Sequence, residues 1–464
     1  MSFWVFIHKL LKSSLFGIII SEIWFKFNYC MATYVINGGK KLNGSIAVRN
    51  AKNSALALLS ASVMVAGRVT LKDMPRIEEV YRFIEMLQSI NVSCEWKDEH
   101  TLVIDSSEKL HLETIDKNAS SKIRSSLLLL GSLASRVPSY RLYRSGGCKL
   151  GERTVRPHLY ALEKFGIDIT TTEEHYEVVA SKKLNAAYVV MYEAGDTPTE
   201  NAIMAAACAE GTTTIKFASA NYMVQDLCYF LVKAGVKISG IGTQTLTIQG
   251  TKKFKSKIEY SVMPDPIEAM AFIAAAITTQ SHLVIENCPI DFLELELEKL
   301  RVMGQQFALH KERKSKNGKF AIVDIEITPS KLAALPDKIH GMPFPGINID
   351  NVPFFVPIAT TAKGRTLIHD WVFENRTFYY LEFQKLGAKV TLLDPHRVFI
   401  EGATPLVARE IIAPDGIRPA MALLVGMLAA KGTSKLRDIY VIERGYEDLE
   451  TRLRSIGVDI TRAE

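Results

Sequence analysis

Hydrophobic and polar positions along this chain repeat with a period of roughly 70 residues. Each copy starts with a small residue and a β-rich run, crosses a polar turn, and continues into a stretch whose apolar residues have helical spacing. Four copies are clear and two are weaker; they begin at Ala66, Ser139, Glu210, Ser281, Lys363 and Lys431. The pattern predicts a unit of strand, turn, helix, glycine and strand, repeated six times.

The copy that begins at Lys363 illustrates the unit. Tyr380, Phe383 and Leu386 recur at a spacing of three on one helical face, and Gly387 follows where a C-cap glycine would end the helix. Segments rich in Ala, Ser and Gly lie between the copies. They predict buried helices, because a helix that is apolar nearly all round must be covered on every side; they span 53–65, 124–134, 200–209, 268–278, 351–362 and 418–430.

The length of 464 residues exceeds what one hydrophobic core usually serves, so two domains are expected. Three units in each domain would give an α/β fold with internal pseudo-threefold symmetry. The chain would cross between the domains near 260–265, after a lysine-rich linker at 252–257. A solenoid is the competing interpretation of the repeat, and the lack of capping repeats weakens it.

The composition is that of a globular protein, with 48% hydrophobic and 23% charged residues. The net charge of +6 is not gathered in a long Lys/Arg block, so it does not by itself indicate nucleic acid, and an anionic small substrate explains it equally well. The six cysteines have neither CxxC nor Cys/His metal spacing. This argues against zinc and a disulfide scaffold, and fits a reducing cytoplasm.

Residues 1–30 are aromatic and aliphatic but interrupted by charges. Their longest charge-free stretch, 13–21, is far shorter than the roughly 20 apolar residues that span a bilayer. We expect an extension upstream of a start at Met31, with a membrane-surface helix and a signal or anchor as alternatives. Membrane contact is expected only if these residues belong to the mature protein.

Two segments place reactive groups in turns. Lys52 directly precedes an Ala/Leu helix, where a positive charge is unfavourable unless an anion binds; a solvated lysine beside an Asn53 cap is the alternative. In the Gly-rich turn SGGCKLGERTVRPH, Cys148 is followed by Arg153 and His158. Neighbouring cations lower the pKa of a thiol, so Cys148 is the cysteine expected to react, although a buried inert cysteine is an equally good reading.

Further charged residues stand at helix starts. Asp350 ends the turn PFPGINID, as either an N-cap or a general base for a hydroxyl. Arg376 and Arg444 occupy equivalent turns of the last two copies, and Arg124 and Arg418 begin predicted helices. Ion pairing is the alternative for these arginines, although exposed pairs contribute under about 1 kcal/mol. With no metal cluster or nucleotide-binding glycine motif, such cations suit a polyanion bound without metal.

At these residues the sequence resembles the enolpyruvyl transferases, from about Met31 to Arg462. The most specific pieces are AKNSAL, GGC with GER, TEN at 199–201, VFENR and RGYEDLE. The resemblance implies two inside-out α/β domains, each of three pseudo-symmetric βαβαββ units. One domain would comprise 31–51 with 264–464 and the other 52–263, which carries the Cys148 loop. The active site would lie in the cleft between them.

The resemblance also implies a role for each residue. Lys52, Arg153 and Arg444 would hold the phosphate and carboxylate of phosphoenolpyruvate, and Asn53 and Asp350 would lie beside the sugar hydroxyl of the acceptor. The rest of the expected substrate-binding set is Arg124, near a diphosphate, with His158, Arg376 and Arg418.

The implied reaction is addition followed by elimination. Cys148, which matches the loop cysteine that fosfomycin alkylates, would protonate phosphoenolpyruvate while Asp350 removes the hydroxyl proton. The expected function is transfer of the enolpyruvyl group to the 3-hydroxyl of UDP-N-acetylglucosamine, with release of phosphate, for cytoplasmic synthesis of peptidoglycan precursors. No cofactor, metal or nucleic acid is expected, and the two substrates are the expected partners.

Several segments depart from the family pattern, including the INID context of Asp350 and DGIRPA in place of a D-L-R run, and two further ones bear on the acceptor. Residues 154–157 differ from the usual run GARPVDLH, and YEAGDTP at 192–198 replaces the usual approach to TEN. Both belong to the expected nucleotide pocket, so another nucleotide or sugar acceptor is the first alternative and shikimate 3-phosphate a lesser one. From other classes, a DNA clamp would need basic helices around a central hole, and a non-catalytic nucleotide-sugar binder stays open.

Overall fold

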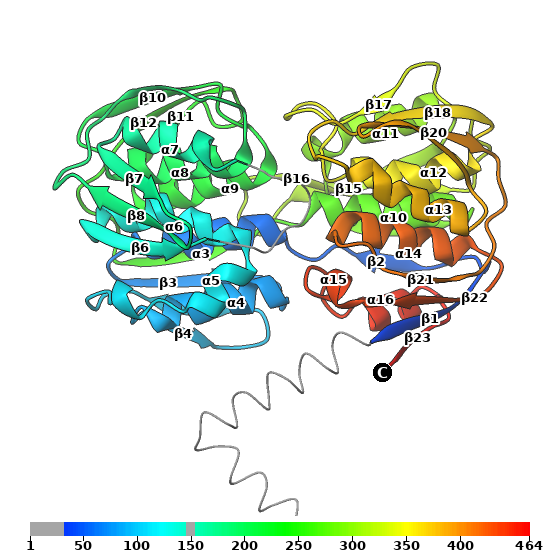
Figure 1. Cartoon of the computed structure of the whole chain (residues 1–464), viewed down its shortest axis with the longest axis horizontal. Coiled ribbons are helices and arrows are strands. Elements are labelled where there is room, and N and C mark those ends of the chain that lie inside the picture. Colours follow the sequence, from blue (N-terminus) through cyan, green and yellow to red (C-terminus); the bar gives the residue numbers. More distant parts are fainter. Residues whose placement is uncertain (1–31, 145–153) are drawn as a thin grey trace, which may run out of the picture.

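Six small sheets, three in each of two lobes, form the β-structure of residues 32–144 and 154–464, which this computed structural model describes (Figure 1). Lobe 1, on the right of Figure 1, contains the first two strands and the part of the chain coloured from yellow-green to red. Lobe 2 contains the blue, cyan and green part between them. The expectation for residues 1–30 lies outside the described residues.

Lobe 1 contains twelve strands. These are β1 (Thr33–Gly38), β2 (Ser45–Ala47), β14 (Leu283–Pro289), β15 (Gln306–Lys314), β16 (Ala321–Thr328), β17 (Ile339–His340), β18 (Gly364–His369), β19 (Lys389–Asp394), β20 (Arg397–Gly402), β21 (Glu410–Ile412), β22 (Gly432–Arg437) and β23 (Ile460–Ala463), counted over the described residues. Their sheet orders are β21-β22-β1-β23, β15-β16-β14-β2 and β17-β18-β20-β19.

Lobe 2 contains the intervening strands. These are β3 (Arg68–Lys72), β4 (Ser93–Trp96), β5 (Leu102–Asp105), β6 (Ser139–Tyr143), β7 (Ile167–Thr171), β8 (His175–Ala180), β9 (Tyr188–Val190), β10 (Thr212–Lys216), β11 (Lys237–Ser239), β12 (Thr245–Gln249) and β13 (Lys257–Ser261). Their sheet orders are β13-β3-β5-β4, β6-β8-β7 and β11-β12-β10-β9.

The predicted sixfold α/β repeat is confirmed. The six copies begin at β3, β6, β10, β14, β18 and β22. In each of the first five the next two strands form an antiparallel pair, and one of them pairs antiparallel with the first strand. In the sixth, β1 from the start of the described chain lies between β22 and β23 and completes the sheet.

Each lobe is inside-out, with one set of helices in its interior and the sheets outside (Figure 1). The helices within the copies are α4 (Glu78–Ser89), α7 (Arg156–Glu163), α9 (Tyr222–Ala234), α11 (Glu294–Val302), α13 (Glu382–Lys385) and α16 (Leu449–Ser455). The helices between copies are α3 (Lys52–Ser62), α6 (Leu129–Ser132), α8 (Asp196–Cys208), α10 (Pro266–Thr278), α12 (Phe355–Thr361) and α14 (Ile417–Ala429). Two short helices, α5 (Lys117–Lys122) and α15 (Tyr440–Glu443), complete the α-helices of the described chain.

Small residues let the interior helices approach their neighbours. All of α10 is buried, as its Ala-rich and Ile-rich sequence predicts. In α14, a Cβ atom added at Gly426 would lie 2.7 Å from the Phe383 ring, so only glycine fits at that contact. The composition of these segments therefore determines how closely α13 and α14 pack.

The chain crosses between the lobes twice, and the two crossings lie side by side. The Ala51 backbone N–H donates to the Met263 carbonyl at 2.8 Å, and that of Asp265 donates to the Arg49 carbonyl at 2.8 Å. Just before the crossings, β2 pairs in parallel with β14, and β13 pairs in parallel with β3. The precise domain limits given above stay predictions.

A third connection runs through the hairpin of β15 and β16. At its tip, Asn317 Nδ2 donates to Asp226 Oδ1 at 3.1 Å and to the Ser261 carbonyl at 3.1 Å, both in lobe 2. Lys316 Nζ lies 2.5 Å from Asp73 Oδ1, also in lobe 2. The hairpin therefore fastens lobe 1 to lobe 2 beside the two crossings.

Several predicted helices differ in detail. The helix expected at 200–209 begins earlier, at Asp196, and the one at 124–134 consists of 3-10 turns, η2 (Arg124–Leu128) and η3 (Leu133–Ser135), around α6. The segment after Asn351 starts as η5 (Val352–Phe354), and residues 376–381 form a 3-10 helix, η6 (Arg376–Leu381), before α13. A spacing of three suits a 3-10 helix as well as an α-helix, so the pattern could not separate them.

The other 3-10 turns are η1 (Leu112–Thr114) and η4 (Ile290–Phe292). Among the described residues, no helix is long and apolar enough to cross a membrane.

Candidate active site

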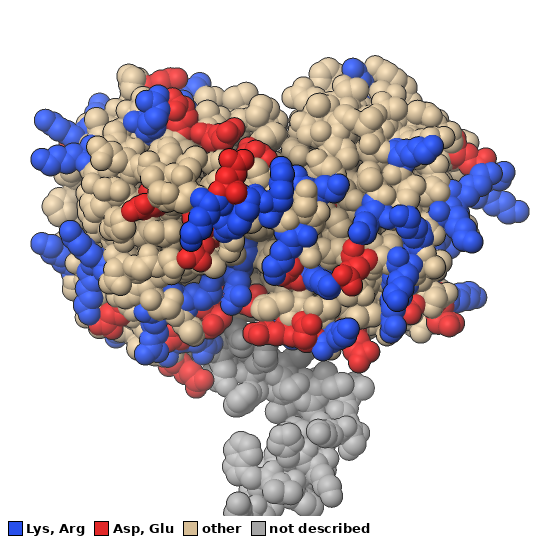
Figure 2. All heavy atoms as spheres, turned by 180° about the vertical axis from the view of Figure 1, so that it is seen from behind, with Lys and Arg blue, Asp and Glu red and all other residues tan. Residues whose placement is uncertain are grey.

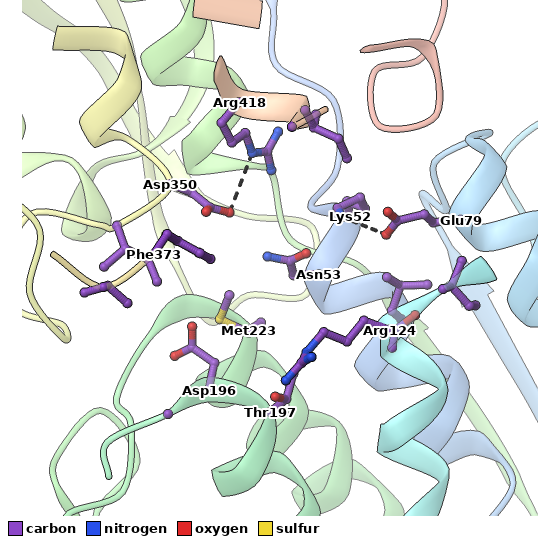
Figure 3. A pocket seen from close by; sticks show the side chains of 18 of the residues that line it. Lys52, Asn53, Glu79, Arg124, Asp196, Thr197, Met223, Asp350, Phe373 and Arg418 are labelled. Carbon is purple, nitrogen blue, oxygen red and sulfur yellow. Dashed lines mark hydrogen bonds and ion pairs between the residues drawn. The ribbon is translucent and has the colours of Figure 1, made fainter. Parts of the chain in front are cut away.

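A cavity of about 500 Å³ lies between the lobes, and helix starts and turns from both lobes line it (Figure 3). Eight of the ten residues predicted from the sequence line this cavity: Lys52, Asn53, Arg124, His158, Asp350, Arg376, Arg418 and Arg444. The other two, Cys148 and Arg153, lie outside the described residues. The structure therefore brings together every predicted site residue that it describes.

Lys52 begins α3 and is paired with an acid. Its Nζ lies 2.7 Å from Glu79 Oε2, and both side chains are largely buried. Burial by itself would raise the pKa of Glu79, but the charges of Lys52 and Arg444 outweigh it and lower that pKa. The N-cap of α3 is Ala51, without a side-chain cap, so the alternative of a solvated lysine beside an asparagine cap is wrong.

Asn53, the second residue of α3, points into the cavity (Figure 3). Its Nδ2 donates to the hydroxyl of Tyr222, at the start of α9, at 3.1 Å. This bond leaves the amide oxygen of Asn53 available as an acceptor, so the side chain can accept a hydrogen bond from a substrate hydroxyl.

Asp350 stands between two buried arginines. Its Oδ1 lies 3.9 Å from Arg376 Nη1 and its Oδ2 lies 3.6 Å from Arg418 Nε. The backbone N–H of Asp350 donates to Asn348 Oδ1 at 2.9 Å. The following turn, η5, has Asn351 as its N-cap and no side-chain cap, so the N-cap interpretation of Asp350 is wrong. The carboxylate is instead presented to the cavity.

Arg376 is engaged by the protein itself. It is 1% exposed, and its Nε and Nη2 donate to the two carboxylate oxygens of Asp370 at 2.6 and 2.7 Å. Nη2 also donates to the Ile349 carbonyl at 2.5 Å. Burial opposes the charge, but Asp370 more than compensates and raises the pKa of Arg376. Arg376 thus fixes the backbone beside Asp350, and the ion-pair alternative raised from the sequence is correct for this arginine.

Arg418, at the second position of α14, keeps its charge in a buried setting. Its Nη1 donates to the Tyr446 hydroxyl at 3.2 Å. Burial alone would lower the pKa of Arg418, but Tyr446 and Asp350 raise it. Figure 3 shows its guanidinium directed at Asp350, so this cation and carboxylate face the same space.

Arg124 and Arg444 supply further positive charge. The side chain of Arg124, at the start of η2, extends toward Thr197 at the start of α8 (Figure 3). Arg444 Nε is buried and has no hydrogen-bond partner in the part of the chain described. A buried donor without a partner is costly, so this guanidinium is suited to an anionic ligand.

His158, on α7, is a neutral hydrogen-bonding residue. Its Nδ1 lies 2.8 Å from Asn201 Nδ2 and its Nε2 lies 3.4 Å from Thr197 Oγ1. Burial, with a smaller contribution from Arg124, lowers the pKa of His158 to about 3. The ring is therefore uncharged near neutral pH, and it accepts the Asn201 amide hydrogen through Nδ1.

The sequence analysis did not predict several acids of the cavity wall, among them Asp196 and Glu200 on α8. Asp196, the first residue of α8, accepts hydrogen bonds from Ser219 Oγ at 2.6 Å and Asn221 Nδ2 at 3.2 Å. Burial raises the pKa values of Asp196 and Glu200. The charge of Asp350 raises the pKa of Asp196 further, and the charge of Asp196 raises the pKa of Glu200 further. The TEN run and the departure at 192–198 drew attention to this segment, but nothing in a local pattern separates a buried acid from an exposed one.

Lys122 and Glu79 also line the cavity and were not predicted. Seen from behind, lysine and arginine side chains gather along the boundary between the lobes, with acidic side chains among them (Figure 2). The boundary is thus a place where a multiply charged anion can meet several cations while acids remain available for proton transfer.

The described cysteines are poor nucleophiles. Burial raises the pKa of Cys94 to about 12 and that of Cys208 to about 11, and it also raises the pKa values of Cys228 and Cys288. All four are free thiols. No group of three or more His, Cys, Asp or Glu residues within 32–144 and 154–464 is arranged to hold a metal ion.

Comparison with known proteins gives matches over nearly the whole chain. The family model for EPSP synthase (3-phosphoshikimate 1-carboxyvinyltransferase) matches residues 36–453. A UDP-N-acetylglucosamine 1-carboxyvinyltransferase of Campylobacter hominis is 35% identical over 429 residues, covering 92% of this chain and 98% of the relative. One of Treponema denticola is 35% identical over 443 residues, covering 94% and 100%.

Two solved structures share the fold. The enolpyruvyl transferase NikO from Streptomyces tendae has a TM-score of 0.80 at 22% identity, covering 93% of this chain and 99% of its own. The EPSP synthase of Acinetobacter baumannii has a TM-score of 0.73 at 19% identity, covering 94% and 100%.

Proposed function

Because this chain belongs to the enolpyruvyl transferase family, we propose that it transfers the enolpyruvyl group of phosphoenolpyruvate to the 3-hydroxyl of UDP-N-acetylglucosamine and releases phosphate. The family resemblance noted in the sequence is thus confirmed. The observation that carries the proposal is the position of Asp350, which lies among cations contributed by both lobes at one cavity. The reaction needs this combination of a proton acceptor and an anion site.

The cations bind the substrates in this proposal. Lys52, Arg444 and Arg153 hold the phosphate and carboxylate of phosphoenolpyruvate, and the unpartnered Nε of Arg444 supports its share. Arg124, beside the start of α8, holds the diphosphate of the acceptor, since cations and helix N-termini both attract phosphate. His158 and Arg376 position α8 and the Asp350 turn.

Addition is the first chemical step. The acceptor oxygen bonds to C2 of phosphoenolpyruvate, its proton passes to Asp350, and the Cys148 thiol donates a proton to C3, which becomes a methyl group. Arg418 Nε lies 3.6 Å from Asp350 Oδ2, so its guanidinium can orient the carboxylate toward the acceptor hydroxyl.

Elimination completes the transfer. The C2–O bond to phosphate breaks, and a proton returns from the methyl group to Cys148. The phosphate leaves with the proton that Asp350 took from the acceptor hydroxyl. The product is an enol ether of the sugar, and the cations stabilise the charge on the leaving group. These substrates are cytoplasmic metabolites, so we place the reaction in the cytoplasm.

Phosphate release from phosphoenolpyruvate with UDP-N-acetylglucosamine tests the proposal. Cys148→Ala and Asp350→Asn should each lower kcat by about 100-fold or more, since a general acid or base contributes roughly that much. Asp459→Asn, at an exposed acid, is the matched control. If the wild-type protein releases no phosphate from phosphoenolpyruvate with UDP-N-acetylglucosamine, the proposal is refuted.

A different nucleotide or sugar acceptor is the second candidate, and Asp196 favours it. A carboxyl group at the start of α8 disfavours a dianionic diphosphate at that helix N-terminus. The same assay with other nucleotide sugars, and with shikimate 3-phosphate, separates the candidates: turnover with one of these acceptors alone would select it.

A further inference from the structure

Tyr222 is a buried tyrosine to which the proposed reaction gives no role. It is the first residue of α9, and it is 0% exposed. Its hydroxyl accepts the 3.1 Å hydrogen bond from Asn53 Nδ2, which is the one hydrogen bond that the Asn53 side chain makes to the described residues. The orientation of the Asn53 amide therefore depends on a single hydroxyl group.

The surroundings of this hydroxyl keep it neutral. Burial raises the pKa of Tyr222 well above its ordinary value, Asp265 adds to this effect, and the positive charge of Arg418 only partly opposes it. The charge of Asp350 also raises this pKa, so the hydroxyl lies within electrostatic reach of the proposed general base. The oxygen thus accepts the amide without bringing a phenolate charge to the site.

The ring of Tyr222 places that hydroxyl relative to the other lobe. It meets the ring of Phe292, in η4 of lobe 1, edge to face, with centroids 6.0 Å apart and planes inclined by 71°. Phe292 in turn contacts Phe344, in the turn that leads to Asp350, with ring centroids 5.2 Å apart. Aromatic pairs prefer such defined geometries, so a continuous series of contacts runs from the Asn53 amide to the Asp350 turn.

Both ends of this series reach the same cavity. Asn53 and Asp350 line it from opposite lobes (Figure 3). Because Tyr222 holds Nδ2 of Asn53, the amide oxygen is left to accept a hydrogen bond from the sugar, beside the hydroxyl that Asp350 deprotonates.

We propose that Tyr222 is a positioning residue for enolpyruvyl transfer: its hydroxyl orients the Asn53 amide toward the acceptor, and its ring aligns that amide with Asp350. The inference rests on the proposed function, because it assumes an acceptor that donates a hydrogen bond to Asn53. Tyr222 does not line the cavity, so it acts through Asn53. Without the hydroxyl, the amide can rotate about its Cβ–Cγ bond, since the terminal torsion of asparagine is broad.

A double-mutant cycle separates positioning from packing. Tyr222→Phe keeps the ring against Phe292 and removes only the hydroxyl. Its kcat/KM for UDP-N-acetylglucosamine should fall about five- to tenfold, which is the effect of one hydrogen bond, while the KM for phosphoenolpyruvate stays near the wild-type value. In the Asn53→Ala background the same change should have less than about a twofold effect, because the hydroxyl no longer has a side chain to orient.

Tyr229→Phe is the matched control. Tyr229 lies on the same helix, and its ring also packs against a phenylalanine of lobe 1, Phe320, with centroids 5.6 Å apart, but it makes no hydrogen bond to Asn53. This variant should keep wild-type kinetics. Equal losses from Tyr222→Phe in both backgrounds, or wild-type kinetics in Tyr222→Phe, would overturn the positioning role.

Nuclear magnetic resonance of protein carrying isotope-labelled asparagine gives a readout that needs no turnover. The side-chain amide signals of Asn53, identified by their absence in Asn53→Ala, should shift in Tyr222→Phe and stay in place in Tyr229→Phe. If they shift while the wild-type protein transfers nothing to UDP-N-acetylglucosamine, the positioning of Asn53 stands and the proposed function fails. If the wild-type protein is active and the signals do not move, the proposed function stands and the role of Tyr222 is wrong.

Discussion

The side-chain amide of Asn348, in lobe 1, donates a 3.4 Å hydrogen bond to the side-chain oxygen of Asn221, in lobe 2. Asn348 Oδ1 also accepts the backbone N–H of Asp350, and Asn221 Nδ2 donates to Asp196. Hydrogen bonds therefore connect the start of α8 with the proposed general base across the boundary. The orientation of Asp350 depends on how the two lobes meet.

Asn348→Ala should lower kcat about five- to tenfold, because one hydrogen bond is worth about 1 kcal/mol and the Asp350 backbone loses its acceptor. The KM for phosphoenolpyruvate should change little, since Asn348 carries no charge. Steady-state kinetics beside Asn43→Ala, an exposed site outside the cavity, provide the measurement. Wild-type kcat in Asn348→Ala would show that the contact does not orient Asp350.

Arg452→Ala should destabilise the protein by about 3–5 kcal/mol, because it leaves the buried carboxylate of Glu268 without its positively charged partner. Arg452 Nη1 and Nη2 donate to the two oxygens of Glu268 at 2.6 and 3.0 Å, beside the chain crossings. Denaturant unfolding measures the effect. Arg454, two positions after Arg452, forms an exposed pair with Glu450. Arg454→Ala should therefore cost well under about 1 kcal/mol, and equal effects of the two variants would refute the argument.

His158 should make stability sensitive to acid. Its pKa is about 3 in the folded protein against 6.5 for the unperturbed group. Between these values the unfolded chain binds the extra proton, so the free energy of unfolding falls as pH decreases from 6.5 toward 3. The contribution is about 1.4 kcal/mol per pH unit.

Urea unfolding of wild type and His158→Gln at several pH values from 7 to 4 checks this effect. The variant should lose less stability on acidification, whereas His310→Gln, at an exposed histidine, should follow the wild type. Parallel curves for His158→Gln and wild type would exclude the assigned shift.

Alkylation should single out Cys148. Iodoacetamide reacts with thiolates, and burial keeps Cys94 and Cys208 protonated at neutral pH. Peptide mapping by mass spectrometry after brief treatment at pH 7.5 should find Cys148 modified well before either of them. Denatured protein, in which all thiols react, is the control; rapid native labelling of Cys208 would contradict the prediction.

The repeat and the fold class were predictable because their signals are local. Alternation, helical spacing and punctuating glycines such as Gly387 recur within each copy, and these features determine strands and helices directly. Helix type was less predictable. The residues around Tyr380 are spaced by three, and that spacing is shared by 3-10 and α-helices.

The site was predictable as a set of residues but not as a network. Lys52 and Arg418 stood out because positive charges are unfavourable at the start of a helix. Their partners did not, since Glu79 and Tyr446 look like ordinary members of amphipathic segments. Arg376 is the clearest example. Its charge suggested a substrate-binding residue, but in the folded chain its guanidinium is paired with the carboxylate of Asp370.

The place of β1 in the last sheet has a consequence for biosynthesis. Strands β3 to β13 are continuous in the sequence, so lobe 2 can assemble while translation continues. Strand β1 must wait, because its neighbours are β22 and β23, and its Tyr34 reaches Glu443 across 409 positions. This first strand of the described chain is among the last to find its partners, and until then a nascent chain exposes an unpaired edge that chaperones are suited to shield.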